Sequence, residues 1–291
     1  MTICAVVILK DALVGIADGR LTSGSQKSFD STEKIIAFQP AYKYPIISMS
    51  RFDRFSHRFG NQWYLMYAGT YALCTEIINL FKRRISGLYL KRDYGQAGLP
   101  VFSYEFDTSR NYMDDYNFDP AELKNFDRMD IITEFKDCLQ EKADEWLSNS
   151  KPIDCQFILF GVRENTDAHQ PQDTYLAYKV TAEQDRSFPS RARIDVQMAS
   201  PYMPVAIGDP LAVTAIVSDN ELQTRIAASI PQVDANDSEC DQWFTLEDAS
   251  RTQEVSSRLI DVISGLNIVS VGGHLLVAEG RHGATPQLSS V

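Results

Sequence analysis

The second residue of the chain is the strongest candidate for a nucleophile. Removal of Met1 would leave Thr2 with a free α-amino group beside its own hydroxyl. An α-amine titrates at about pH 7.7–8.0, so it can accept the hydroxyl proton without a histidine. Thr2 therefore combines a nucleophile and a base in one residue, although many proteins begin Met-Thr for no catalytic reason.

Two charged residues and a glycine could complete such a site. Asp18 follows an apolar stretch and Lys34 begins another. A cation beside Thr2 would disfavour protonation of the α-amine and stabilise an alkoxide, and Asp18 would hold Lys34 charged and oriented. Gly69 lies between an expected strand and an expected helix, where backbone N–H groups can bind an oxyanion. Taken singly, Asp18 and Lys34 are more often solvated charges at a turn or a strand end, and Gly69 can serve only a tight turn between strand and helix.

Other chemistry has little support in the sequence. The five cysteines and four histidines are scattered without metal-ligand spacing, so we expect reduced, mostly buried thiols and no metal or cofactor. The chain lacks the GxxxxGK[ST] pattern, so any use of ATP would come from a partner.

Composition and charge narrow the function classes further. The 291 residues include 28 Lys and Arg against 39 Asp and Glu, which gives a net charge of −11. This acidity argues against nucleic acid as a partner, because affinity for phosphates needs clustered cations. The apolar run at residues 3–9 is far shorter than the roughly 20 residues of a membrane helix, and no basic stretch precedes it as in a signal peptide. We therefore expect a cytoplasmic protein without a membrane partner.

Apolar patterns predict the elements that position these residues. Helical spacing marks residues 70–86, 129–150, 210–217 and 245–264, and Asp209 is typical of a helix N-cap. Continuous apolar or β-rich runs predict the strands, at residues 3–9, 13–17, 34–38, 63–67, 155–162, 174–180, 192–199, 268–271 and 275–277. Such segregated blocks of strands and helices favour an α+β fold.

The order of these motifs resembles a known family. Thr2, Asp18-Gly19-Arg20, Lys34 and Ala68-Gly69-Thr70 are similar to the pattern of proteasome β-subunits and of the bacterial proteasome-like peptidase, which are N-terminal-nucleophile (Ntn) hydrolases. The resemblance is best over residues 2–38 and 63–86. It implies one Ntn-hydrolase-like domain over residues 1–291, a four-layer αββα sandwich with insertions at about 39–62 and 87–128.

The resemblance also assigns roles to particular residues. Thr2 would be the nucleophile, Lys34 would tune its amine, Asp18 would position Lys34, and the amide of Gly69 would bind the oxyanion. Thr22 would contact the substrate backbone. The pocket for the residue before the cut would be lined by Leu21, Thr32, Ile36, Tyr67 and Tyr71, and its two tyrosines predict a preference for small or flat side chains. The supporting residues would be Arg20, Asp209 and Asn267.

By this resemblance we expect an N-terminal threonine peptidase that hydrolyses peptide bonds through a threonine ester. Its substrates would be peptides or unfolded proteins, its assembly a homo-oligomeric ring, and its partner a separate ATP-dependent unfoldase. Two alternatives stay open: a non-catalytic ring or scaffold subunit of the same fold, and an Ntn amidase that acts on small amides. Asp209 and Asn267 favour the non-catalytic alternative, because the family usually has serine and aspartate there.

The two insertions have no assigned role. Arginines alternate with aromatic residues over 50–59, which is compatible with stacking on nucleic acid. In a chain of charge −11, however, packed aromatics with solvated arginines, or a contact between subunits, are better interpretations. Long insertions typically form lids or subunit interfaces.

Overall fold

The computed structural model describes most of the chain. The described residues are 2–9, 12–22, 28–29, 33–49, 51–94, 100–105, 130–163, 174–230, 246–266, 268, 271, 274–281 and 285–291. No helix among them is long and apolar enough to cross a membrane. The prediction of a single domain remains a prediction.

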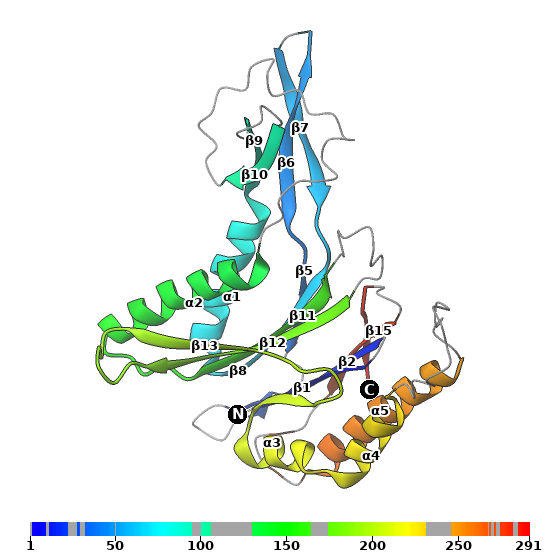
Figure 1. Ribbon diagram of the computed structural model, residues 1–291. Helices are drawn as coiled ribbons and strands as arrows, with labels where there is room; N and C mark the ends of the chain where they lie inside the picture. Colours follow the sequence, from blue (N-terminus) through cyan, green and yellow to red (C-terminus); the bar gives the residue numbers. More distant parts are fainter. Residues whose placement is uncertain are drawn as a thin grey trace.

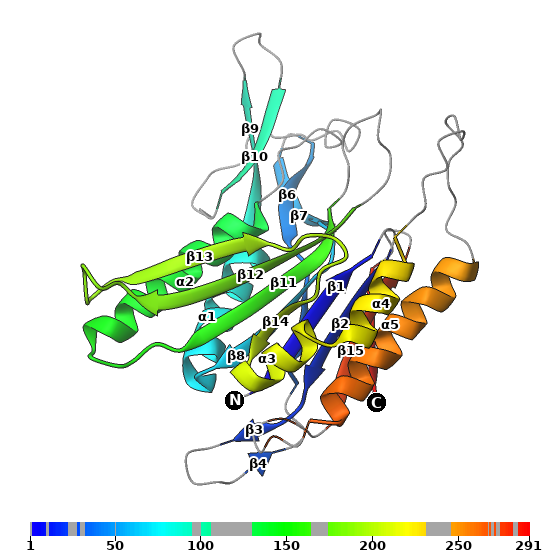
Figure 2. The ribbon, with the colours of Figure 1, turned by 60° about the horizontal axis from the view of Figure 1, so that its bottom comes forward.

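Two five-stranded antiparallel sheets form the body of the protein (Figures 1 and 2). The first has the order β14-β1-β2-β15-β16, and the second has the order β13-β12-β11-β8-β5. The first consists of β1 (Ile3–Ile8), β2 (Ala12–Asp18), β14 (Val205–Gly208), β15 (Leu275–Arg281) and β16 (Gln287–Ser290). The second consists of β5 (Ile35–Phe38), β8 (Trp63–Gly69), β11 (Cys155–Arg163), β12 (Thr174–Gln184) and β13 (Ala192–Met198).

The inner faces of these sheets share a hydrophobic core. Val6 and Leu13 of the first sheet belong to the same buried cluster as Met66 and Phe160 of the second. Every residue of β1 and β2 is buried, which explains why both strands are continuous apolar runs in the sequence rather than alternating ones. The predicted hairpin at the start of the chain is confirmed by the antiparallel pairing of β1 with β2.

Helices cover the outer faces of both sheets. α1 (Tyr71–Ser86) and α2 (Ile131–Ser148) share one buried cluster with β8, β11 and β12. α3 (Pro210–Val217), α4 (Asn220–Ala228) and α5 (Leu246–Ser264) share another with β1, β2 and β15. The four predicted helical stretches therefore form helices. A fifth helix, α4, lies between the last two of them in the sequence.

A third sheet projects from the body (Figure 1). Its order is β10-β9-β6-β7, formed by β6 (Ala41–Ser48), β7 (Arg51–Phe59), β9 (Leu88–Tyr94) and β10 (Pro100–Glu105). The parallel pairing of Tyr42 with Leu88 and of Lys43 with Tyr89 joins the two predicted insertions to each other. A separate two-stranded ribbon consists of β3 (Leu21–Thr22) and β4 (Ser28–Phe29).

This architecture corrects the predicted fold class, a four-layer αββα Ntn-hydrolase sandwich with insertions. The described chain is sheet-rich: it has three sheets and a ribbon, with five helices beside them. The predicted scheme gave residues 39–62 and 87–128 no structure of their own, whereas they contribute the four strands of the third sheet. Its pairing joins segments more than 40 residues apart, and no local pattern in either segment indicates such a pairing.

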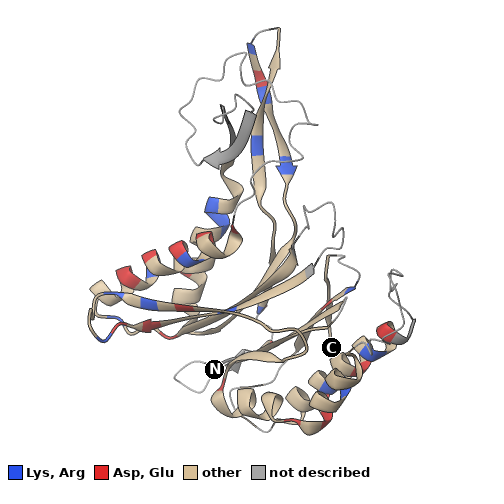
Figure 3. Cartoon of the chain, viewed as in Figure 1, with Lys and Arg blue, Asp and Glu red and all other residues tan. Residues whose placement is uncertain are grey.

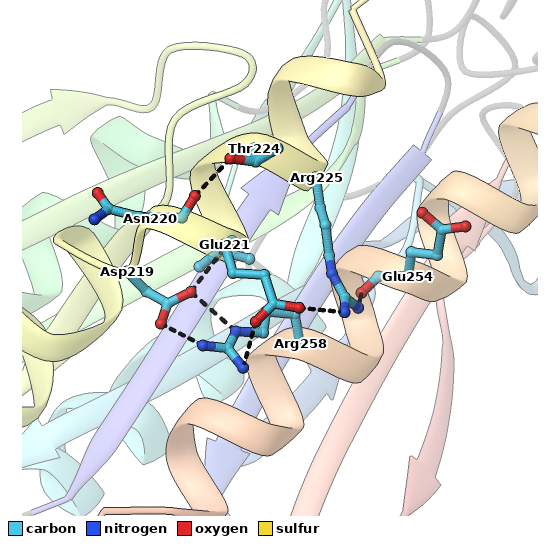
Figure 4. A network of polar contacts seen from close by, with 8 residues as sticks. Asp219, Asn220, Glu221, Thr224, Arg225, Glu254 and Arg258 are labelled. Carbon is cyan, nitrogen blue, oxygen red and sulfur yellow. Dashed lines mark hydrogen bonds and ion pairs between the residues drawn. The ribbon is translucent and has the colours of Figure 1, made fainter.

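Arginines of two helices hold α4 against α5 (Figure 4). Asp219 caps α4 by accepting a hydrogen bond of 2.7 Å from the Leu222 amide. It also receives two hydrogen bonds from the Arg258 guanidinium of α5, at 2.9 and 2.7 Å. Glu221 bridges Arg225 at 2.6 Å and Arg258 at 2.9 Å. The hydrogen bonds from Arg258 lower the pKa of Asp219 below its ordinary value of 3.8.

We predict that Asp219→Asn destabilises the protein in a pH-dependent manner. Asn keeps the helix cap but removes the charge that pairs with Arg258. The pKa of Asp219 is lower in the folded state than its ordinary value. The contribution of its charge to the free energy of unfolding is therefore fully present above pH 3.8, and it is lost as the pH falls through the folded-state pKa. Urea unfolding should therefore show a gap between wild type and variant at pH 7 that narrows below pH 3.8. An equal gap at both pH values would contradict the prediction.

Candidate active site

Thr2 and Asp18 meet at the end of the first hairpin. Cys4 lies opposite Ala17 in the antiparallel pairing, so the residue before β1 comes beside the last residue of β2. The Thr2 hydroxyl donates a hydrogen bond to Oδ1 of Asp18, and the Ile3 amide donates to the same oxygen at 2.9 Å. Thr2 is 1% exposed and Asp18 is fully buried. Asp18 thus contacts the predicted nucleophile directly, whereas the sequence suggested that it acts through Lys34.

Lys34 lies directly before β5, with only 3% of its surface exposed. Its Nζ is 5.4 Å from the centroid of the Tyr67 ring, within the range of a cation–π contact. The Tyr67 hydroxyl donates a hydrogen bond of 3.2 Å to the Glu33 carbonyl. Burial raises the pKa of Tyr67, which keeps this hydroxyl protonated as a donor. Tyr67 therefore contacts both Lys34 and the residue before it.

Cys4 connects these charged groups. Burial raises the pKa of its thiol, Asp18 raises it further and Lys34 lowers it, so both charges act at this one position on β1. Its Sγ donates to the Tyr67 carbonyl at 3.6 Å. The thiol is neutral at physiological pH and is no competing nucleophile. All four cysteines within the described ranges, Cys4, Cys74, Cys138 and Cys155, are free and buried, as predicted.

Gly69 ends β8 in a conformation that only glycine adopts readily. Its φ is 110°, and a Cβ at this position would lie 2.1 Å from the Asp154 carbonyl oxygen. The Thr70 amide donates to that oxygen at 2.6 Å. The Thr70 amide is therefore already bonded at this turn, and Gly69 itself pairs with Cys155 of β11.

A second turn of the same design supports Thr2 itself. Gly208 has φ 115°, and a Cβ there would lie 1.8 Å from the Thr2 carbonyl oxygen. The Asp209 amide donates to this oxygen at 2.8 Å. Asp209 caps α3 by accepting from the amides of Leu211 and Ala212, at 2.9 and 3.4 Å. The cap was predicted; the contact of this turn with Thr2 was not.

Arg20, Tyr71 and Ile36 are the other predicted site residues whose side chains the structure describes. Nη1 of Arg20 donates to the Val271 carbonyl at 3.2 Å. The centroid of the Tyr71 ring lies 6.4 Å from that of Tyr67, and Tyr71 is 46% exposed. Ile36 is partly buried against the hydrophobic cluster that α1 and α2 share with β8, β11 and β12. Leu21 and Thr22 form β3, but their side chains are outside the described set, as are Thr32 and Asn267 altogether. Within the described ranges, no group of His, Cys, Asp and Glu could hold a metal ion.

Comparison with known proteins gives a limited result. No family model and no curated protein matches the sequence. Three similar solved structures are Anbu proteins. Each comparison spans 99–100% of this chain and 86–87% of the Anbu chain. They are a Gly-1 mutant from Hyphomicrobium sp. strain MC1 (11% identity, TM-score 0.47), a helical assembly of the Anbu complex from Pseudomonas aeruginosa (14%, 0.48), and Anbu (ancestral beta-subunit) from Yersinia bercovieri (15%, 0.45).

These findings correct the predicted family. Membership in the proteasome β-subunit or bacterial proteasome-like peptidase family is not supported, because the solved structures are Anbu proteins at low identity and at TM-scores below 0.5. The sequence resemblance depended on four short motifs, and strand ends with Asp, Lys or Gly are common in unrelated sheets. Likeness at this level carries no argument about activity, which has to come from the geometry around Thr2.

Proposed function

We propose that the chain is an N-terminal threonine hydrolase that cleaves peptide bonds once Met1 has been removed. The observation that carries this proposal is the buried hydrogen bond from the Thr2 hydroxyl to Asp18. A threonine beside a carboxylate at the start of the chain, with a buried lysine whose charge acts on Cys4 as that of Asp18 does, has the parts of a self-sufficient nucleophile.

The reaction would proceed in two steps. In the processed chain the Thr2 hydroxyl turns its proton from Asp18 to the α-amine, which accepts it while Oγ1 attacks the peptide carbonyl carbon, and the Gly69 amide stabilises the oxyanion. The ammonium then gives its proton to the departing amine as the C–N bond breaks, which leaves an ester on Thr2. Water, deprotonated by the same amine, attacks the ester and restores the hydroxyl.

Asp18 and Lys34 would set the electrostatics of this reaction. Asp18 orients the hydroxyl by accepting its hydrogen bond, and Lys34 keeps the α-amine neutral and stabilises charge on oxygen. Tyr67 and Tyr71 would limit the pocket to small or flat side chains. Arg20, Leu21, Thr22, Thr32, Ile36, Asp209 and Asn267 keep the supporting and substrate-binding roles expected from the sequence. Peptides or unfolded proteins as substrates, a homo-oligomeric ring, a separate unfoldase and a cytoplasmic location belong to the same proposal.

One observation favours a second candidate function. Thr2 is 1% exposed, and its carbonyl and hydroxyl are both engaged by the protein. If Met1 is retained, the chain would be a non-catalytic subunit whose Thr2 only ties β1 to β2 and β14.

Substitutions of Thr2 test the proposed nucleophile. Thr2→Ala should lower peptide hydrolysis at least ~10³-fold, whereas Thr2→Ser should keep measurable activity, because serine retains the hydroxyl. Intact-mass spectrometry must first show that Met1 is absent, and an N-terminal-threonine probe such as an epoxyketone should label the wild type but not Thr2→Ala. Processed protein with neither turnover nor labelling would contradict the proposal.

Substitutions of Tyr67 test the proposed effect of Lys34 on the α-amine. Loss of the ring in Tyr67→Leu should let Lys34 move away from the α-amine, whose pKa would then rise. Because the base must be neutral, the acid limb of the kcat/KM profile should shift to higher pH. Tyr67→Phe is the matched control: it loses only the hydrogen bond to Glu33 and keeps the ring, so its acid limb should match the wild type. Identical limbs in all three proteins would rule out this role of Tyr67.

A further inference from the structure

The hairpin of β6 and β7, residues 41–59, differs in charge from the rest of the chain. We call it the projecting hairpin. It contains four of the 28 Lys and Arg but one of the 39 Asp and Glu, which gives it a charge of +3 against −14 for the remaining residues. Figure 3 shows its cations along both strands, with a single acidic position between them. The four cations are Lys43, Arg51, Arg54 and Arg58, and the acid is Asp53.

A shift in strand register gathers aromatic rings on one face of this hairpin. Pro45 lies opposite Phe55, but the register shifts between Ile46 and Ile47, so that Ile47 lies opposite Phe52. The shift leaves Asp53 without an opposite residue and turns Phe52 to the face of Phe55. The centroids of these two rings are 5.0 Å apart.

The row of rings continues in both directions. Phe55 packs edge-on against Tyr89 of β9 at 5.3 Å, and His57 stacks on Phe59 at 6.3 Å. Much of this surface faces solvent in the single chain, since Phe52 is 44% exposed, Phe59 is 60% exposed and Met49 at the turn is 95% exposed. Arg54 lies at an alternate position of β7, opposite Ile46, and so on the other face of the hairpin, with 72% of its side chain exposed. Arg51 and Arg58 share this face, so the hairpin presents apolar rings on one face and guanidinium groups on the other.

This composition is typical of a protein interface. Aromatic residues, Met and Arg are enriched at the centres of such interfaces, whereas acidic residues and Lys are depleted. β7 is also the last strand of its sheet in the described chain, and an exposed edge is a site where another chain can pack or pair. Single-stranded nucleic acid would also use rings and arginines, but the charge of −14 on the rest of the chain opposes a polyanion.

We propose that the projecting hairpin is a docking surface for a second copy of this chain. Charge complementarity selects this partner, because every copy carries both the basic hairpin and an acidic remainder. Exposed carboxylates are available on the described helices, for example Glu141 and Glu145 of α2. Their present ion pairs are exposed and contribute little, so their exchange for arginines of another copy costs little. The inference does not depend on whether Thr2 is catalytic.

Self-association of the full-length chain tests this surface. Sedimentation velocity over a concentration series should show oligomers at about 50 mM salt that weaken at about 500 mM, because screening acts on exposed charges. Arg51→Glu with Arg54→Glu should raise the dissociation constant at least ~10-fold, and Phe52→Ser with Phe59→Ser should do the same through loss of apolar contact. Arg191→Glu with Arg193→Glu, at exposed positions at and near the edge strand β13, is the matched control and should leave association unchanged.

Photo-crosslinking locates the contact if other surfaces also hold copies together. A benzophenone amino acid in place of Phe52, in a mixture of ¹⁵N-labelled and unlabelled chains, should give crosslinked peptides of mixed isotope composition. A monomeric wild type at low salt, crosslinks within one chain only, or normal association of both hairpin variants would overturn the proposal. Binding of a single-stranded oligonucleotide that only the hairpin variants lose would overturn it too, in favour of nucleic acid.

Discussion

The site depends on a buried carboxylate at the end of β2. A fully buried Asp18 is costly unless hydrogen bonds compensate for its lost hydration, and the chain supplies them from the Thr2 hydroxyl and the Ile3 amide. Both donors come from the strand that pairs with β2, so the register of one hairpin decides whether the carboxylate is compensated. A slip of one residue would turn every side chain of β1 to the other face and remove the hydroxyl from Asp18.

Two glycine turns hold the strands that meet at this site. At Gly69 and at Gly208 the chain leaves a strand with positive φ, and the next amide donates to the carbonyl before the neighbouring strand. The two turns therefore perform the same structural task in the two sheets of the body. Because a Cβ would lie about 2 Å from a carbonyl oxygen at either position, these contacts are specific to glycine. The first turn aligns β8 with β11, and the second fixes the backbone of Thr2.

The sequence could predict what local patterns determine. The continuous apolar runs gave the first hairpin, and that hairpin alone brings Thr2 to Asp18. Helical spacing and the Asp209 cap gave most helices. Three features could not be predicted from the sequence: the contact of Gly208 with Thr2, the parallel pairing of Tyr42 with Leu88, and the register shift that places Phe52 on the same face as Phe55. Each depends on which distant segments meet, and propensity and periodicity describe only the segment itself.

The position of the projecting hairpin explains how such an addition leaves the site intact. In the sequence it lies between β5, which follows Lys34, and β8, which carries Tyr67. A distortion where the hairpin leaves these two strands would therefore separate Lys34 from Tyr67. The base is closed by two hydrogen bonds, from the Gly60 amide to the Pro40 carbonyl at 2.9 Å and from Gln39 Nε2 to the Gly60 carbonyl at 2.7 Å. Below it, Phe38 already pairs with Trp63, and the register continues to Ile35 and Met66. Strand pairing near the site is therefore complete before the hairpin begins, and the projecting surface can vary without moving Lys34 from Tyr67.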